Sequence, residues 1–155
     1  MKFQIQREDL LVILKKIIDA VEKRQTMPAL SNILIKADKD KISLTATDLE
    51  IELVTTMNMV ADEAGDTTLP ARKLLDICKA LPEESSISIA VDSNKALIKS
   101  GRSRFSLATL PANDFPALDA INSVYEFTMP QNVLKNLIDK TAFAMAQQNV
   151  RYYLN

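Results

Sequence analysis

The sequence predicts an α+β fold in which two helices pack on antiparallel sheets. The first observation is the order of its hydrophobic patterns, which runs strand, helix, three strands, helix, three strands. The second is that the strand segments alternate apolar and polar residues, whereas two longer segments carry apolar stripes at helical spacing. The third is that a helix followed by three strands occurs twice, which indicates one internal pseudo-repeat.

The first half of the pattern begins with a short alternating strand and an amphipathic helix. The strand is predicted over Lys2–Gln6 and the helix over residues 7–22, and Pro28 breaks the connection that follows. Polar turn residues separate the first two strands of the next group, and Gly65-Asp66 is assigned to the loop after the third. The three strands are predicted at Asn32–Ala37, Ile42–Asp48 and Leu49–Val60.

The second half opens with a helix between two prolines. Pro70 is expected at its start, where a missing N–H costs nothing, and Leu81-Pro82 closes it. Three more alternating strands follow, at Ser86–Val91, Lys95–Ser100 and Arg104–Leu110.

The last of these strands is predicted to lie at a sheet edge. Phe105, Leu107 and Thr109 share one face of it. Gly101 supplies the turn before it, and the prolines at 111 and 116 cannot donate to a strand ladder after it. An edge strand keeps one row of backbone hydrogen-bonding groups available to a partner.

Several residue types needed for catalysis are missing from the composition. The chain has no histidine, which is the commonest general base and metal ligand, and its two glycines cannot form a glycine-rich phosphate loop. Its single cysteine, Cys78, lies on the apolar side of the second helix, where a buried structural thiol is expected rather than a nucleophile. We therefore expect no enzyme, no metal and no cofactor. One cysteine without a disulfide partner suits a reducing cytosol.

The net charge of −1 does not by itself indicate a nucleic-acid binder, but the charges are unevenly distributed. Residues 38–66 are strongly acidic, whereas residues 95–104 carry four cations and no acid. Ordinary solvated surface explains this on composition alone. The alternative is a protein that binds DNA on one face.

Four segments carry a resemblance to a known family. They are SGRSRFSLATLPANDFP (100–116), TLPARKLLDICKALP (68–82), TATDLEIEL (45–53) and VRYYLN (150–155). Together they closely resemble the first domain, and the start of the second, of the bacterial sliding clamp, the beta subunit of DNA polymerase III. Each half of the predicted pattern is similar to the strand–helix–three-strand unit from which clamp domains are built.

A longer repeat agrees with that resemblance. Apolar residues near the N-terminus recur at one constant spacing near the C-terminus, for example Phe3 as Phe127 and Leu10 as Leu134. We therefore expect a first clamp domain over residues 1–117, a linker over 118–123 and the truncated start of a second domain over 124–155. The last segment is expected to contain a strand (Val124–Met129) and a helix (about Pro130–Gln147). Without the rest of its sheet it should be disordered or should dock on another surface.

The resemblance implies a function in DNA replication in the cytoplasm. Clamps of this family are rings of two subunits that encircle duplex DNA, independently of sequence, and tether the polymerase. The polymerase and the clamp loader bind a cleft between the second and third domains, which this chain lacks. A stand-alone protein-interaction domain of the same fold that never touches DNA is the alternative, and the gene sequence beyond Asn155 would discriminate between the two.

The resemblance also assigns site residues. Five positions match clamp residues that touch DNA, namely Arg24, Arg72, Gln148, Tyr152 and Tyr153. Without the family match, Arg72 is an ordinary solvated helix residue and the two tyrosines belong to a strand. Five others match the contact between subunits: Lys73, Arg102, Arg104, Phe105 and Leu107. From the pattern alone, Phe105 and Leu107 are equally well explained as core residues; as interface residues they should be at least partly exposed.

Overall fold

The computed structural model describes residues 1–21, 27–116 and 124–146, and the chain divides into two compact units, Met1–Leu118 and Asp119–Asn155. The first unit contains two α-helices and eight strands among its described residues. In chain order these are β1 (Lys2–Gln6), α1 (Arg7–Ile17), β2 (Asn32–Ala37), β3 (Lys41–Thr47), β4 (Glu52–Asn58), β5 (Gly65–Pro70), α2 (Ala71–Ala80), β6 (Ser86–Asp92), β7 (Lys95–Ser100) and β8 (Ser103–Ala108). Short 3₁₀ helices occupy Ile18–Ala20, Pro28–Ser31 and Ala112–Asp114.

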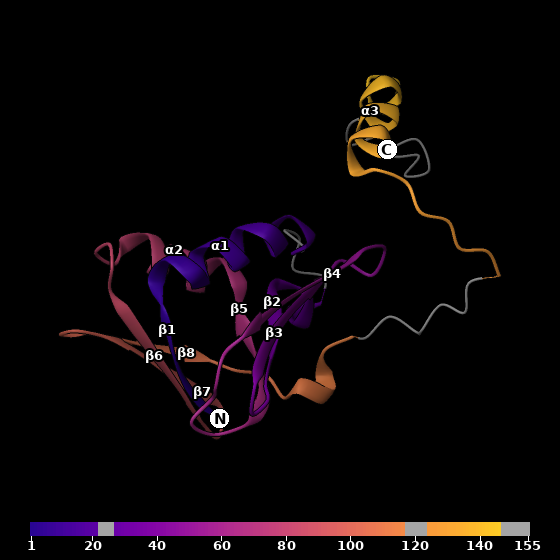
Figure 1. The fold of residues 1–155 in the computed structure, drawn as a ribbon. Coiled ribbons are helices and arrows are strands. Elements are labelled where there is room, and N and C mark those ends of the chain that lie inside the picture. Colours follow the sequence, from indigo (N-terminus) through magenta and orange to yellow (C-terminus); the bar gives the residue numbers. More distant parts are fainter. Residues whose placement is uncertain (22–26, 117–123, 147–155) are drawn as a thin grey trace. The chain divides into compact units, whose positions relative to one another are not determined.

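The eight strands form two antiparallel sheets of four, in the orders β1-β6-β7-β8 and β4-β3-β2-β5. Each sheet takes one edge strand from the other half of the chain, because β1 pairs with β6 and β5 pairs with β2. Figure 1 shows the two helices along one side of the unit and the strands on the other. The α+β fold with helices on antiparallel sheets is confirmed.

The internal pseudo-repeat is visible in the strand register. Gln6, the last residue before α1, pairs with Ser86, the first residue of β6. Pro70, the last residue before α2, pairs with Asn32, the first residue of β2. The two strand–helix–three-strand units therefore exchange their first strands in the same register, and neither half can complete its sheet alone.

One strand, β5, is missing from the seven that the hydrophobic pattern predicts. Gly65-Asp66 is predicted to be a loop, but β5 begins at Gly65 and pairs with β2 over its whole length. The alternation fails here because Thr67, Thr68 and Leu69 are all buried in succession. A strand buried on both faces does not show the polar–apolar pattern on which the prediction depended.

Other differences concern the ends of elements. The α-helical geometry of α1 stops at Ile17, and a 3₁₀ turn continues to Ala20, so the helix is shorter than the predicted 7–22. The fourth strand begins at Glu52 rather than Leu49, because the preceding residues form a tight turn. In that turn the Asp48 Oδ1 atom accepts the N–H groups of Glu50 (3.0 Å) and Ile51 (2.8 Å).

The core lies between the helix pair and the inner faces of the sheets. Its largest fully buried side chains come from both halves of the chain, and each contributes about 1.5–3 kcal/mol by leaving water. They include Phe3, Leu10, Leu14, Ile17, Ile33, Ile35, Ile42, Leu44, Leu69, Leu74, Ile87 and Ile89.

The described part of the second unit contains one helix, α3 (Gln131–Ala142), and none of the helix's residues is buried. The strand expected at Val124–Met129 does not form, because a strand needs a neighbour for its backbone groups and the described residues of this unit, 124–146, provide none. The expected helix also ends five residues early, at Ala142 rather than 147. No helix among the described residues is long and apolar enough to cross a membrane.

Candidate functional site

The outward faces of α1 and α2 form one surface that carries exposed cations. The two helices pack against each other (Figure 1), and Leu10, Leu14, Leu74 and Cys78 are buried. We call the solvent-facing side of the pair the helix-pair surface. Its exposed cations are Lys15, Lys16, Arg72, Lys73 and Lys79.

These cations are free to meet a ligand. None of the five takes part in an ion pair with another described residue. The exposed acids nearest to these cations in the chain are Asp76 of α2 and Asp19 of the 3₁₀ turn that follows α1, so the surface is basic by a small margin. A mildly basic surface attracts a polyanion without holding it in one place.

Arg72 and Lys73 lie in the first turn of α2, where the helix end adds to their positive field. Pro70 stands at the N-cap position and provides no side-chain hydrogen bond, and the first turn contains no acidic residue. The backbone N–H groups at a helix start carry partial positive charge and commonly contact phosphate. This end of α2 is therefore the part of the helix-pair surface best suited to a phosphate group.

Arg7, by contrast, is held within the structure. Its Nε atom donates to the Cys78 carbonyl oxygen at 2.8 Å, and its guanidinium pairs with Glu8 at 3.0 Å. This contact ties the start of α1 to the end of α2.

Burial also raises the pKa of the Cys78 thiol to about 11. Cys78 is fully buried, as expected for a structural thiol.

Four of the five residues matched to DNA contacts cannot be placed. Arg24, Gln148, Tyr152 and Tyr153 lie outside the residues that the structure describes. Arg72 is the one member of this set with a described position, and it is exposed on the helix-pair surface.

The strand β8 forms the edge of its sheet, as the sequence analysis predicted. The N–H of Thr109 donates to the carbonyl of Asn94 at 3.0 Å, which sets the alternation of hydrogen-bonded pairs along β7 and β8. The backbone groups of Arg104, Ser106 and Ala108 consequently point away from β7. Over these residues the edge is open to an additional strand.

The five side chains matched to the subunit contact differ in exposure. Arg102 and Arg104 are exposed, as is Lys73 on α2. Phe105 is half-buried and packs against the core cluster. Leu107 is only 8% exposed and belongs to that cluster, so the expectation that it is partly exposed is wrong. The reason is the pleat, which turns Leu107 towards the inner face with Phe105 and Thr109.

Two features of this site could not be found by residue type. The open backbone edge of β8 depends on which residues of β8 bond to β7, and a sequence does not show that register. The sequestration of Arg7 depends on a carbonyl that is distant in the chain.

Among the described residues, no cluster of His, Cys, Asp or Glu could hold a metal ion.

The chain is similar to known proteins over its whole length. It is 53% identical to the beta sliding clamp of Pseudomonas aeruginosa and 49% identical to that of Escherichia coli K12. All of this chain is covered in both alignments, but only 42% and 43% of the relatives' own lengths are. The chain thus spans less than half the length of these relatives.

The chain is also similar in fold to solved structures. The DNA polymerase III subunit beta of Pseudomonas aeruginosa superposes with a TM-score of 0.90 at 52% identity. The pol III beta of Caulobacter crescentus does so with a TM-score of 0.92 at 41% identity. In both comparisons all of this chain and 42% of the other chain are covered.

Residues 1–119 also match the family model of the DNA polymerase III beta subunit, N-terminal domain. This match covers both strand–helix–three-strand units and the edge strand β8. The chain therefore belongs to the DNA polymerase III beta subunit family, the bacterial sliding clamps.

Proposed function

We propose that this chain is the N-terminal part of a replication processivity factor, a ring-shaped clamp that encircles duplex DNA and tethers the polymerase. The proposal rests on the family membership together with one observation, the exposed cations on the helix-pair surface, which form no ion pair with another described residue. The domain division proposed is 1–117 for the first clamp domain, 118–123 for a linker and 124–155 for the start of the second.

The helix-pair surface would form part of the wall of the ring. Duplex DNA carries one negative charge per about 1.7 Å of axis, so a wall with a small positive excess attracts it without reading bases. A ring that slides needs weak contacts, because closure around the DNA keeps it bound. Arg72, at the start of α2, would contact phosphate directly. Arg24, Gln148, Tyr152 and Tyr153 are proposed to contact the DNA with it.

The open edge of β8 would join a second subunit. Three free backbone positions, at Arg104, Ser106 and Ala108, support strand addition, and Arg102 and Lys73 supply exposed cations for an acidic partner edge. Phe105 would contribute its exposed part, whereas Leu107 would support the strand from the core. The ring would then be a homodimer of the longer protein.

The remaining assignments follow from family membership. We propose a non-catalytic accessory subunit that needs no cofactor and acts in the cytoplasm. The polymerase and the clamp loader are proposed as partners that bind through domains beyond Asn155.

A salt titration of DNA binding tests the DNA-facing assignment in the longer protein. Replacing one phosphate-contacting cation should weaken binding and reduce the salt slope by about one unit. We expect this for Arg72→Ala. The matched control is Lys36→Ala, an exposed cation on β2 that lies off the helix-pair surface and should change neither quantity. Equal slopes for Arg72→Ala and the unsubstituted protein would contradict the assignment.

The alternative is a protein-interaction domain of clamp fold that never binds DNA. The open β8 edge favours it as much as it favours a ring, because strand addition serves either function. The gene sequence downstream of Asn155 separates the two. Two further clamp domains support the ring, and a stop codon supports the interaction domain.

A further inference from the structure

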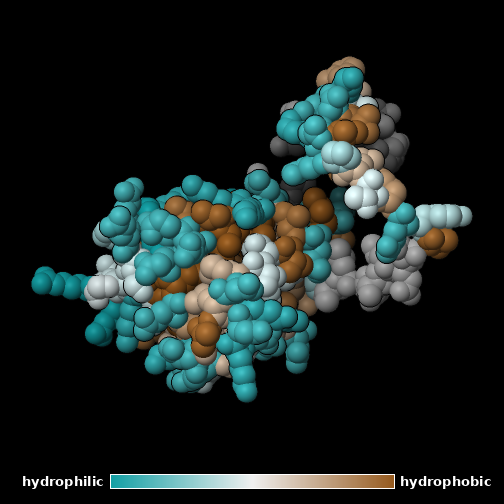
Figure 2. Space-filling model, viewed as in Figure 1, coloured by the Kyte–Doolittle hydropathy of each residue, from teal (hydrophilic) through white to brown (hydrophobic). Residues whose placement is uncertain are grey.

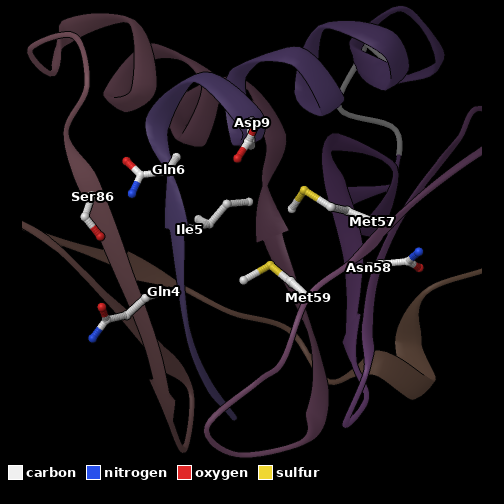
Figure 3. Close-up of a pocket in the computed structure, with 8 residues that line it drawn as sticks. All are labelled: Gln4, Ile5, Gln6, Asp9, Met57, Asn58, Met59 and Ser86. Carbon is white, nitrogen blue, oxygen red and sulfur yellow. The ribbon is translucent and has the colours of Figure 1, made fainter.

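A cavity of about 290 Å³ opens between the two sheets, where the edge strand of one faces the edge strand of the other. We call it the β1–β4 groove. Figure 3 shows Met57 on β4 and Met59 just after it pointing towards Ile5 on β1, and Asp9 pointing from α1 into the space between the two segments. Gln4, Gln6, Asn58 and Ser86 complete the lining. The groove is separate from both the helix-pair surface and the open edge of β8.

At one end of the groove β1 pairs with the chain that follows β4, and the two segments then separate. At one end the Lys2 N–H donates to the Glu63 carbonyl at 2.9 Å, and the Glu63 N–H donates back at 3.0 Å. This antiparallel bridge is isolated, so the next residues of β1 and the chain after β4 do not continue it. The groove lies where that pairing would have continued.

The register of β1 leaves backbone groups facing the groove. The contacts that flank the β1–β6 ladder, Val91 N–H to the Met1 carbonyl and Arg7 N–H to the Ser85 carbonyl, are both 2.9 Å long. Since hydrogen-bonded pairs alternate in an antiparallel ladder, Phe3 and Ile5 bond to β6. The N–H and C=O of Gln4, and the N–H of Gln6, therefore point towards the groove.

The opposite wall has the same property. The Met59 N–H donates to the Asp40 carbonyl at 3.0 Å, which assigns Met59 and Met57 to the ladder with β3. The backbone groups of Asn58 between them point towards the groove. The groove is thus bordered by two unpaired strand edges, each able to accept a neighbour.

In the other half of the pseudo-repeat, the residue that corresponds to Gln4 pairs with an extended segment of the chain. Thr68 on β5 corresponds to Gln4 on β1, because each precedes its helix by the same number of residues. Thr68 is not left open, since its N–H donates to the carbonyl of Leu110, in the extended segment after β8. The chain supplies its own extended segment at Thr68, whereas none of its described residues pairs with Gln4 on the groove side.

The side chains of the groove set the chemistry of an occupant. Ile5 is buried, and Met57 and Met59 are half-buried, so the floor is apolar and adaptable. Asp9 is the one charged side chain in the lining, and it has no hydrogen bond or ion pair with another described residue. Figure 2 shows hydrophobic residues gathered in the middle of this face of the first unit, with hydrophilic residues around them.

We propose that the β1–β4 groove binds a short extended peptide segment of another protein by strand addition. The segment bonds to the free backbone groups of Gln4 and Asn58. It places an apolar side chain on Met57 and Met59, and a Lys or Arg side chain two residues away against Asp9. A cavity at the lower end of the usual range for ligand sites suits a few residues rather than a long strand.

The experiment uses the full chain labelled with ¹⁵N and titrated with acetyl-Thr-Lys-Thr-Val-Thr-amide, in which Lys and Val share one face. We expect the amide signals of Gln4, Gln6 and Asn58 to shift and their hydrogen exchange to slow. A second peptide of the same sequence, methylated on its central backbone nitrogens, cannot donate the strand hydrogen bonds. It should leave these signals in place.

Charge is tested on both sides of the contact. Replacing Lys by Glu in the peptide should weaken binding, and so should Asp9→Asn in the protein, by about two- to fivefold for a partly exposed ion pair. The matched control is Asp76→Asn, the same change at an exposed position of α2 outside the groove, which should leave the affinity unchanged.

Three outcomes overturn the proposal. The first is a titration that moves none of the three amides. The second is a shift at Ser106 without one at Gln4, because the peptide would then prefer the open edge of β8. The third is the same set of shifts on concentrating the protein without peptide, which would make the occupant a second copy of this chain.

Discussion

Thr68 and Leu110 join the edges of the two sheets through both main chain and side chain. The Thr68 N–H donates to the Leu110 carbonyl at 3.2 Å, and the Leu110 N–H donates to the Thr68 hydroxyl at 3.2 Å. The same hydroxyl accepts a hydrogen bond from Asn32 Nδ2 at 2.8 Å. One buried threonine therefore connects β2, β5 and the segment after β8, which fixes how the two halves of the chain meet.

Thr68→Val should destabilise the first unit by about 1–3 kcal/mol. Valine keeps the shape of the side chain but removes an acceptor, so the buried amide of Asn32 is left without its partner. Thr67→Val is the matched control, because Thr67 is also buried but makes no side-chain hydrogen bond with a described residue. Urea unfolding curves of the two variants measure the difference; equal midpoints would show that the hydroxyl contributes nothing.

Cys78 should resist alkylation in the folded protein. Its thiol is fully buried and its pKa is raised to about 11, so almost no thiolate exists near neutral pH and reagents cannot reach it. Iodoacetamide at about pH 8 should modify the chain only after guanidinium is added, as mass spectrometry would reveal. Rapid modification without denaturant would contradict the packing of α2.

Stability should depend on pH through Glu8. Its pKa lies below the ordinary value of 4.5, because its carboxylate accepts the Glu84 N–H at 3.0 Å and pairs with Arg7. The unfolded chain therefore binds a proton more readily. The contribution of Glu8 to the free energy of unfolding is complete above the pKa that Glu8 has in the unfolded chain. It is lost as the pH falls through the lower pKa of the folded state.

Unfolding curves of Glu8→Gln test this sign. The variant should be less stable than the unsubstituted chain at about pH 6, and the difference should shrink at about pH 3. Glu83→Gln, an exposed neighbour with no side-chain hydrogen bond to a described residue, serves as control and should show no such trend. A difference that grows on acidification would rule out the assigned role of Glu8.

Alanine substitutions at Leu107 and Arg104 should distinguish the core-facing side of β8 from its exposed side. Leu107→Ala removes a buried side chain from the core cluster and should cost about 2–5 kcal/mol. Arg104→Ala changes an exposed residue and should alter stability by less than about 0.5 kcal/mol. If β8 is the subunit edge, Arg104→Ala should weaken dimerisation of the longer protein, which sedimentation measures. Unfolding by Arg104→Ala would mean that this edge is part of the core.

The fold was largely predictable because its strands and helices alternate in a regular way. Seven of the eight strands and both helices of the first unit could be located from hydrophobic spacing, and the prolines correctly indicated that β8 lies at an edge. The strand that was not predicted, β5, has three consecutive buried residues, so it lacks the alternation of polar and apolar residues by which strands are recognised. The exchange of β1 and β5 between halves is a matter of pairing, which periodicity does not encode.

The site was predictable only in part. Arg72 could be named from its matched position, and its exposure agrees with a binding role, but a charged helix residue has no signature of its own. Leu107 is assigned to the interface by its matched position, and the pattern alone explains it equally well as a core residue, because alternation does not say which face of an edge strand is covered. The β1–β4 groove depends on where two strands stop pairing, and residue types give no indication of that.

The last prediction concerns α3, which has no buried residue. Its apolar side chains Leu134, Leu137 and Ile138 are each about half exposed, so tertiary packing contributes little to its stability. Isolated helices shorter than about 12–15 residues are marginal in water, and α3 spans only Gln131–Ala142. Its amides should therefore exchange with solvent almost freely in this chain, whereas those of α2 in the same sample should be protected.

Extending the chain should change that result. In a protein that continues through the rest of the second domain, the apolar face of α3 can pack on a sheet, and its amides should become as slow as those of α2. Hydrogen exchange measured by mass spectrometry compares the two proteins segment by segment. Protection of α3 in a dilute sample of the present chain would mean that its apolar face is already covered, and that residues 124–155 do not need the remainder of a domain to fold.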